Sequence, residues 1–519
     1  MTTEREITGL EAIRLAAVDS DVRFITAVAG YPITAVADLF FKEKDSGSYQ
    51  INWFTNEKAA LEAALGASVT GRRSMVLVKH VGMNVLADPL MTAMMHTIGA
   101  GLVILAGDDP GAKASQNEQD SRFYGALAET AVFDPATPQD AYDSLNRAFG
   151  LCEETGVPVI MRITDRLEKA EQGIRRIRRT VHGKTGAGTP GKKFDREMWK
   201  FTMHGKHQRF HIFTEPLMMY EAENSRFNRV SMSGEKVGII SSGYPSSIVD
   251  EILSTQLVYS GCSHLALGLV TSLPKNIIMQ FIDKHERVLI VEESEAFIES
   301  YVSTCNHDRI LGKKSGHLPV GMIEKEHIEF ALENIDMDRV SKYTDIQTIA
   351  ARGSRPICSD CPFMPLYNVL HDIEPVAGDM GCSIRTAPQP LTAVNTGFSL
   401  GGAISTACGF PGKGVAVIGD FGLAHSGITG LINAVYGGFD ILVFILRNEI
   451  AAMTGGQLAP DLLEVVKVLV PDTTVIDIDR CMSFDGSIET ENMFKDVIEQ
   501  KLGTKGVSVV YIEGKCTKY

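Results

Sequence analysis

Two polar side chains follow two apolar strands predicted in the C-terminal third of the chain. Asp420 comes just after Val415–Ile418, and Asn448 comes just after Ile441–Leu446. The stretch His425–Tyr436 between them is typical of a helix, so the segment predicts a strand–helix–strand unit of a parallel sheet. Carboxylate and amide oxygens are ligands that a divalent cation prefers, and such a cation can hold a diphosphate. The segment therefore predicts a cation–diphosphate site at the ends of two strands.

The spacing of these residues is similar to the thiamine diphosphate signature, which reads Gly-Asp-Gly and ends in Asn. Gly419 and Asp420 match its start, and Asn448 matches its end. In such a site Asp420, Asn448 and the backbone carbonyl near Ile450 would bind Mg²⁺. Phe421 stands where the signature has its second Gly, and an ordinary α/β crossover with an incidental Gly-Asp pair is the alternative interpretation.

Thiamine chemistry also needs a carboxylate that faces the pyrimidine ring of the cofactor. In an apolar setting a carboxyl group has a raised pKa, so it can share a proton with a ring nitrogen. Glu57 in WFTNEKAALEAALGAS is the candidate, at the start of a predicted helix over Asn56–Val69. A glutamate in the first turn of a helix is also favoured by the helix macrodipole, and position alone favours that structural interpretation.

Four of the nine cysteines form a pattern in the C-terminal third. Cys358 and Cys361 are two residues apart in CSDC, Cys382 follows in GDMGCS, and Cys516 lies near the C-terminus. Four thiolates can hold a 4Fe–4S cluster. A structural zinc site and buried, unlinked thiols are the alternatives. An odd number of cysteines spread over 519 residues does not predict a disulfide scaffold, so we expect a cytoplasmic location.

Composition excludes several classes of protein. The formal net charge of −14 disfavours a general nucleic-acid-binding protein and favours a soluble one. Apolar residues make up 44% of the chain, which is enough for several cores, but no run of 18 apolar residues predicts a membrane span. The acidic, amphipathic N-terminus MTTEREITGLEAIRL does not resemble a secretory signal.

The order of apolar runs and turn signals predicts a multi-domain α/β fold. Continuous apolar runs such as Phe24–Val28 and Leu102–Ala106 are typical of strands buried on both faces. We expect a first block at 1–170, a basic connector at 171–234, a small doubly wound α/β block at 235–335 and a third block at 354–519.

The connector has an unusual charge. Between Gly173 and Phe210 there are eleven Lys and Arg residues against two Asp and Glu residues. A docking patch for an acidic partner and a solvated linker are both open interpretations, and charge runs are more often simply solvated.

Several longer motifs carry a resemblance to a known family. The chain resembles the large (alpha) subunit of indolepyruvate:ferredoxin oxidoreductase, within the 2-oxoacid:ferredoxin oxidoreductases, over nearly its whole length. The motifs are GYPIT, NEKAALEAALGAS, VKHVGMNVLADPLMT, GDDPGAKASQNEQDSRFYG, GDMGCS, HSGITGLINAVY and NEIAAMTGGQ. The resemblance implies two thiamine-diphosphate-binding-type parallel-sheet domains: a pyrimidine domain at 1–170 and a diphosphate domain with the cysteine cluster at 354–519.

The resemblance also implies roles for individual residues. It makes Glu57 the glutamate that activates the cofactor. It places Thr34, Lys79, His80 and Asn84 at the reacting end, Asn117 and Arg122 in a second loop, and Thr454 and Gly455 where the family closes over the cofactor. Arg122 could hold the substrate carboxylate or form a structural ion pair. His80 could act as an acid–base group or be occupied by local hydrogen bonds.

The activity that the resemblance implies is oxidative decarboxylation of a 2-oxo acid, such as an aryl pyruvate, to an acyl-CoA. Electrons would pass through iron–sulfur centres to ferredoxin, a small beta subunit would be the partner, and two large subunits would pair. The sequence ends at Tyr519 without the ferredoxin-like domain usual in the family. A non-oxidative decarboxylase or carboligase, and a non-catalytic paralogue, are the alternatives.

Overall fold

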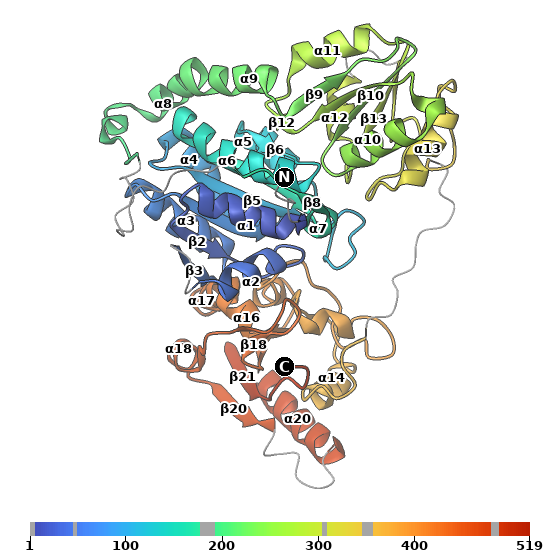
Figure 1. The fold of residues 1–519 in the computed structure, drawn as a ribbon. Coiled ribbons are helices and arrows are strands. Elements are labelled where there is room, and N and C mark those ends of the chain that lie inside the picture. Colours follow the sequence, from blue (N-terminus) through green and yellow to red (C-terminus); the bar gives the residue numbers. More distant parts are fainter. Residues whose placement is uncertain (1–5, 45–48, 177–191, 304–308, 345–355, 479–486) are drawn as a thin grey trace. The chain divides into compact units, whose positions relative to one another are not determined.

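The chain divides into two compact units, residues 1–349 and 350–519. The structure is a computed structural model that describes residues 6–44, 49–176, 192–303, 309–344, 356–478 and 487–519. Parallel sheets with helices between the strands form each unit (Figure 1), which confirms the predicted α/β fold.

Unit 1 contains a seven-stranded sheet. Its spatial order is β12 (Leu269–Thr271), β6 (Val132–Phe133), β7 (Val159–Thr164), β5 (Leu102–Asp108), β4 (Ser74–Lys79), β2 (Phe24–Ala27) and β3 (Gln50–Trp53). Only the β12–β6 pair is antiparallel. All residues of β5 and β7 are buried, as expected for parallel strands with both faces covered.

The helices of this sheet position the candidate residues. Helices α1 (Gly9–Asp19) and α6 (Pro138–Thr155) pack together, as do α3 (Glu57–Val69) and α4 (His80–His96). Asn56 caps α3 by accepting the backbone N–H of Lys58 at 2.9 Å, which sets Glu57 in the first turn. The other α-helices between β1 and β8 are α2 (Thr34–Lys42), α5 (Arg122–Ala128) and α7 (Asp165–Lys169).

A second sheet of unit 1 has the order β14 (Ile310–Leu311), β13 (Arg287–Val291), β10 (Val237–Ser242), β11 (Ser263–Leu267) and β9 (Asn228–Ser231). Its helices are α10 (Pro245–Thr255), α11 (Lys275–Asp283), α12 (Phe297–Val302) and α13 (Lys325–Glu333). The expected small block is less separate than its sequence indicates, because β12 leaves it to join the seven-stranded sheet. A short pair, β1 (Glu6–Thr8) with β8 (Glu171–Gly173), completes the strands of unit 1 that the structure describes.

The segment 171–234, expected to be a basic connector, is not a plain solvated linker in its described part. Its described part contains a 3-10 turn (Arg196–Lys200), α8 (Met203–Arg209), a π-turn (Phe210–Thr214), α9 (Glu215–Asn224) and β9. Phe210, Met218 and Ala222 are buried in the core of unit 1, so this part of the segment is a folded element of that unit. Residues 177–191 of the predicted connector lie outside the described residues.

Unit 2 contains a five-stranded parallel sheet with the order β15 (Val376–Ala377), β16 (Gly414–Gly419), β17 (Ile441–Arg447), β21 (Val507–Glu513) and β20 (Thr473–Asp477). Between β16 and β17 the chain forms α16 (Asp420–Gly422), a π-turn (Leu423–Gly427) and α17 (Ile428–Tyr436), which confirms the predicted strand–helix–strand unit. Helices α14 (Met364–Leu370), α15 (Ala403–Ala407), α18 (Leu463–Leu469) and α20 (Ser487–Leu502) surround this sheet.

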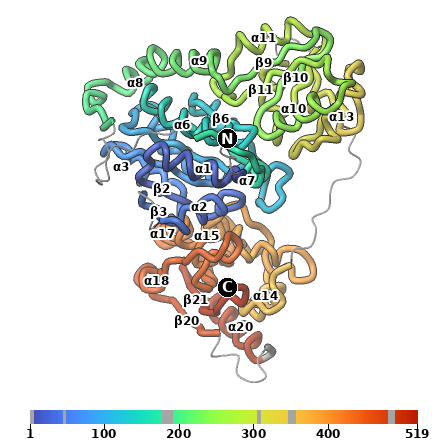
Figure 2. The backbone as a smooth tube through the Cα atoms, viewed as in Figure 1, coloured from blue at the N-terminus to red at the C-terminus, as the bar shows by residue number. Residues whose placement is uncertain are grey.

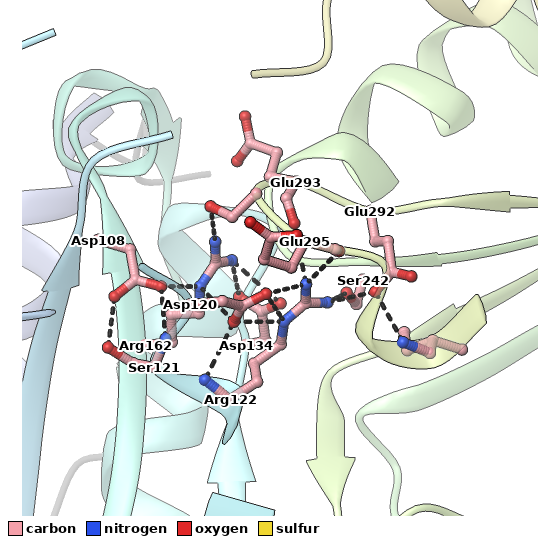
Figure 3. A network of polar contacts seen from close by, with 12 residues as sticks. Asp108, Asp120, Ser121, Arg122, Asp134, Arg162, Ser242, Glu292, Glu293 and Glu295 are labelled. Carbon is pink, nitrogen blue, oxygen red and sulfur yellow. Dashed lines mark hydrogen bonds and ion pairs between the residues drawn. The ribbon is translucent and has the colours of Figure 1, made fainter. Parts of the chain in front are cut away.

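A buried network of ion pairs joins the two sheets of unit 1 (Figure 3). Arg162 in β7 donates to Asp108 at 2.6 Å and to Asp134 at 3.1 Å, and its side chain is 1% exposed. Arg122 lies beside it and reaches Glu292, which follows β13. Buried charges persist only when they are paired, so these arginines hold the carboxylates at the ends of several strands.

We predict that Arg162→Met destabilises unit 1 strongly. The substitution keeps much of the side-chain volume but leaves Asp108 and Asp134 buried without their cation, which costs about 3–5 kcal/mol. Urea denaturation of the full chain measures the loss. The exposed Arg196, replaced in the same way, serves as the control and is expected to change stability by less than about 0.5 kcal/mol. Equal stability of the two variants would contradict the structural role of Arg162.

Candidate active site

The carboxyl ends of β16 and β17 bring the predicted cation ligands together. The two strands are parallel neighbours, with Gly419 opposite Leu446. Asp420 therefore begins α16, which Figure 1 labels, and it contacts the turn that contains Asn448. This is the edge of a parallel sheet at which ligands bind in open α/β folds.

Asp420 is buried and ties the two strand ends to each other. Its Oδ1 accepts the backbone N–H of Phe421 at 2.7 Å, and its Oδ2 accepts those of Asn448 at 3.1 Å and Glu449 at 2.7 Å. Burial raises the pKa of Asp420 from 3.8 to about 6, although these three hydrogen bonds oppose the shift. A carboxylate in this condition gains from a cation, so the local chemistry fits a divalent ion.

The rest of the predicted set lies in the loop that follows. The Oδ1 atom of Asn448 accepts the backbone N–H of Ile450 at 3.2 Å. Thr454 donates its hydroxyl to Gln457 at 3.1 Å, between the short strands β18 (Ile450–Ala451) and β19 (Gln457–Leu458). The space around the Cα of Gly419 is open, since a Cβ there would meet no atom within 4 Å. Hard oxygen donors and this free space fit a Mg²⁺-diphosphate group.

The sequence analysis missed a second buried carboxylate at the same sheet edge. Asp379 follows β15 and is 1% exposed. Its Oδ1 accepts the backbone N–H of Gly401 at 2.5 Å, while its Oδ2 has no hydrogen-bond partner. Burial raises its pKa to about 6. A Cβ on Gly422 would come within 2.1 Å of that free oxygen, so Asp379 reaches the loop of Asp420. The sequence does carry a signal for Asp379, because a Gly-Asp pair follows the short apolar run in EPVAGD. The same pair opens the motif GDMGCS, which drew attention for its cysteine instead.

In unit 1 Glu57 is held in a tight pocket between α3 and α4. The side chain is 4% exposed. A Cβ at Gly82 would lie 2.7 Å from its Oε1, so the backbone of α4 approaches the carboxyl group closely. The carboxyl group is therefore buried, and the backbone of α4 lies directly beside it.

Lys79 and Thr34 lie near this carboxyl group. Burial lowers the pKa of Lys79, and the charges of Glu57 and Asp109 oppose the shift. The Lys79 side chain packs against Gly30, where a Cβ would lie 2.5 Å from its Cδ. Thr34 bonds to both backbone groups of Gly30, accepting at 2.9 Å and donating at 3.1 Å. Structure and motif therefore bring Thr34, Lys79 and Glu57 into one neighbourhood.

His80 and Asn84 take local partners. The ring of His80 is fully buried, with Nδ1 3.2 Å from the carbonyl oxygen of Gly107 and Nε2 3.0 Å from that of Asn117. The geometry favours the alternative in which local hydrogen bonds occupy this histidine. Asn84 is exposed and bonds to Gln119 at 3.2 Å.

The prediction that Arg122 holds a substrate carboxylate is wrong in this structure. Its side chain is completely buried. Its five N–H groups donate to Asp120, Ser242, Glu292 and the backbone carbonyl of Glu293, so none is left for a ligand. The ion-pair alternative is the one that the structure supports. Glu292 and Ser242 lie far along the chain, which is why the sequence did not distinguish the two roles.

The four patterned cysteines lie close enough to influence one another. Burial raises the pKa of Cys361 to about 12, and the neighbouring Cys382, Cys358 and Cys516 add to the shift. No three of the four sulfurs, all of which are described, lie within 4.8 Å of one another. Tetrahedral zinc would hold its sulfurs about 3.8 Å apart. The four sulfurs are therefore near one another without the spacing of a preformed zinc site, and a cluster and free thiols both fit this arrangement.

Comparison with known proteins finds a family match around each of two half-sites. The first half-site is the Glu57 region of unit 1, and the second is the Asp420–Asn448 region of unit 2. Residues 16–195 match the family described as pyruvate flavodoxin/ferredoxin oxidoreductase, thiamine diP-binding, and residues 379–512 match the thiamine pyrophosphate enzyme C-terminal TPP binding domain. The chain is 30% identical to indolepyruvate oxidoreductase subunit IorA of Archaeoglobus fulgidus, over 87% of this chain and 76% of that relative. The chain belongs to the family of indolepyruvate oxidoreductase IorA subunits. It is thus a thiamine-diphosphate-dependent member of the 2-oxoacid:ferredoxin oxidoreductases.

Other members of the family and one solved structure are also similar. The IorA subunit of Methanothermobacter marburgensis is 29% identical over 98% of this chain and 86% of that relative. A structure of 2-oxoglutarate:ferredoxin oxidoreductase from Magnetococcus marinus matches with a TM-score of 0.52 and 16% identity, over 64% of this chain and 65% of that one. At this identity the likeness shows the fold. Among the described residues no helix is both long enough and apolar enough to cross a bilayer.

A buried acid beside the GYPIT loop gives a pH-dependent prediction. Glu168 on α7 is 3% exposed, and its Oε1 has no hydrogen-bond partner. Burial, with a further contribution from Asp165, raises its pKa from 4.5 to about 8. The folded state therefore holds a proton that the unfolded chain has lost throughout that interval, and stability falls as pH rises through it.

We predict that Glu168→Gln removes this pH dependence. The variant should gain stability over the parent by about 1.4 kcal/mol per pH unit within the interval, with no further gain above about pH 8. Thermal and urea unfolding across pH measure the difference. Glu171→Gln, at an exposed position nearby, should show no such trend. A constant difference between about pH 6 and about pH 8 would be the contrary result.

Proposed function

We propose that the chain is the catalytic large subunit of an enzyme that oxidatively decarboxylates a 2-oxo acid to an acyl-CoA. The observation that carries the proposal is the pair of half-sites within the two matched segments. One offers a buried Glu57 in the pyrimidine-type segment, and the other offers Asp420 with Asn448 in the diphosphate-type segment.

In this proposal Mg²⁺ would be held by the side-chain oxygens of Asp420 and Asn448 and by the carbonyl of Ile450. Asp379 Oδ2 faces the same loop and adds negative charge beside it. Bound thiamine diphosphate supplies a carbon nucleophile and an electron sink for loss of CO₂. Gly419 leaves space for the diphosphate, and Thr454 lies in the loop over it.

Glu57 would hold a proton at its carboxyl group and share it with a nitrogen of the pyrimidine ring. Its burial against Gly82 excludes water from that proton. Lys79, whose pKa burial lowers, and the Thr34 hydroxyl would line the reacting end. These residues bind, orient and exchange protons, whereas the electrons need a separate route.

For that route we propose a 4Fe–4S cluster on Cys358, Cys361, Cys382 and Cys516. Conversion of a 2-oxo acid and CoA to acyl-CoA and CO₂ releases two electrons and one proton. Iron–sulfur centres carry single electrons, so two molecules of oxidised ferredoxin would be reduced per turnover. The proximity of the four thiols, three of which add to the raised pKa of Cys361, supports this assignment.

The relatives are named indolepyruvate oxidoreductase subunits, and an aryl pyruvate is therefore the substrate class that we propose. We further propose a small beta subunit as partner and pairing of two copies of this chain. Sedimentation equilibrium of the purified chain at the mass of a single copy would contradict the pairing.

The cofactor assignment predicts that two substitutions affect different steps, one cofactor binding and the other proton exchange. Asp420→Ala should weaken Mg²⁺-dependent binding of thiamine diphosphate by more than about 100-fold, because it removes a ligand of the ion. Glu57→Gln should keep binding within about tenfold but slow hydrogen–deuterium exchange at C2 of the cofactor by about 10²–10⁴-fold. Calorimetry and exchange measured by NMR give the two quantities.

The matched controls are Asp496→Ala and Glu62→Gln, at exposed positions of α20 and α3. Neither should change binding or exchange. Cofactor binding that survives Asp420→Ala would defeat the proposed function, as would unchanged C2 exchange in Glu57→Gln.

The cluster assignment predicts about four iron and four sulfide per chain in anaerobically purified protein. Cys361→Ser should lose most of both, since one ligand is removed, whereas Cys408→Ser should keep them because that cysteine lies outside the pattern. Metal analysis and the visible absorption spectrum measure the content. Protein without iron that releases CO₂ and forms an aldehyde or acyloin would favour the non-oxidative alternative.

A further inference from the structure

A cluster of histidine and carboxylate side chains lies outside both half-sites, on the segment that the sequence marked as a connector. Helix α8, the π-turn and α9 follow one another as a continuous helical path (Figure 2). His207, His211 and Glu215 are spaced four residues apart on this path, so they share one side of it. None of them takes part in the proposed reaction.

The contacts within the cluster are close. Nδ1 of His211 lies 2.7 Å from Oε2 of Glu215, and Nε2 of His211 lies 3.1 Å from Nε2 of His207. Glu129, directly after α5, brings a second carboxylate. One possible ligand atom each from Glu129, His211 and Glu215 lies within 4.8 Å of the other two. Within the described parts of the chain these three form the single group of at least three metal-ligating residues at that spacing.

The contacts between these groups suit either a shared proton or a bound metal ion. A ring nitrogen and a carboxylate oxygen 2.7 Å apart are both acceptors unless a proton or a metal ion lies between them. His207 offers its Nε2 to the other ring nitrogen of His211, which can donate an N–H there. That tautomer directs the Nδ1 lone pair towards the carboxylates.

We propose that Glu129, His211 and Glu215 bind a divalent transition-metal ion of the Zn²⁺ class, with His207 orienting the His211 ring. Imidazole and carboxylate are ligands that Zn²⁺ accepts in proteins, whereas Mg²⁺ and Ca²⁺ prefer oxygen ligands only. Three protein ligands leave a fourth position for water. A histidine that binds a metal usually donates its other N–H to a fixed partner, and His207 supplies that partner here.

The ion would join the end of α5 to the α8–α9 segment. Helix α5 begins at Arg122, which is anchored in the buried ion-pair network, and Glu129 follows its last residue. Helix α9 is attached to the core through Met218 and Ala222. A metal bridge from Glu129 to His211 and Glu215 would fasten the α8–α9 segment to this anchored helix.

Zinc content tests the proposal. The full chain, stripped with a chelator, is dialysed against buffered Zn²⁺ at micromolar free concentration, and bound zinc is counted by mass spectrometry. The parent and the control His204→Gln, an exposed histidine of α8, should hold one equivalent more than His211→Gln. His207→Gln should keep the equivalent but bind it about 10–100-fold more weakly. The cysteines and Asp420 are present in all of these variants, so zinc bound there cancels.

Glu129→Gln guards against a folding artefact, because Glu129 is exposed and its replacement leaves the helices intact. It should also lose the equivalent while its circular dichroism spectrum stays that of the parent. Equal zinc in the parent, His211→Gln and Glu129→Gln would overturn the proposal. That result would mean that His211 and Glu215 share only a proton.

Discussion

A carboxylate buried at the carboxyl edge of a parallel sheet must be matched by hydrogen-bond donors or by a cation, and the structure depends on how each one is matched. Unit 1 uses arginines: Arg122 and Arg162 neutralise the acids where its two sheets meet. Unit 2 holds Asp379 and Asp420 with backbone N–H groups, and burial raises the pKa of both to about 6. The first arrangement is complete without a ligand, whereas the second gains from an added cation.

How a buried polar group is paired distinguishes structural from functional residues better than its position in a cofactor motif does. Arg122 lies within a family motif, yet every donor it has is used inside the protein. Asp379 received no role in the sequence analysis, yet one of its oxygens is buried without a partner. Unpaired buried polar atoms are costly, so they persist where a ligand or a functional demand compensates for them.

Local pattern was a good guide to most elements. The apolar runs of β5, β16 and β17 predicted buried strands, because parallel strands covered on both faces are apolar throughout. The connector misled for the opposite reason. Its dense lysine and arginine residues obscured the few apolar positions, such as Phe210 and Met218, that attach α8 and α9 to the core. The cationic run ends at Arg209, so it says little about the folding of the residues that follow it.

The sequence by itself determined the element types and which side chains stand at their ends, including Glu57, Asp420 and Asn448. Those properties depend on residues that are neighbours along the chain. Three contacts depend on the tertiary structure alone. The backbone at Gly82 packs against Glu57, Arg122 forms an ion pair with Glu292, and Glu129 lies near His211. Each of these contacts joins residues far apart in sequence, so its energy depends on packing that no local pattern encodes.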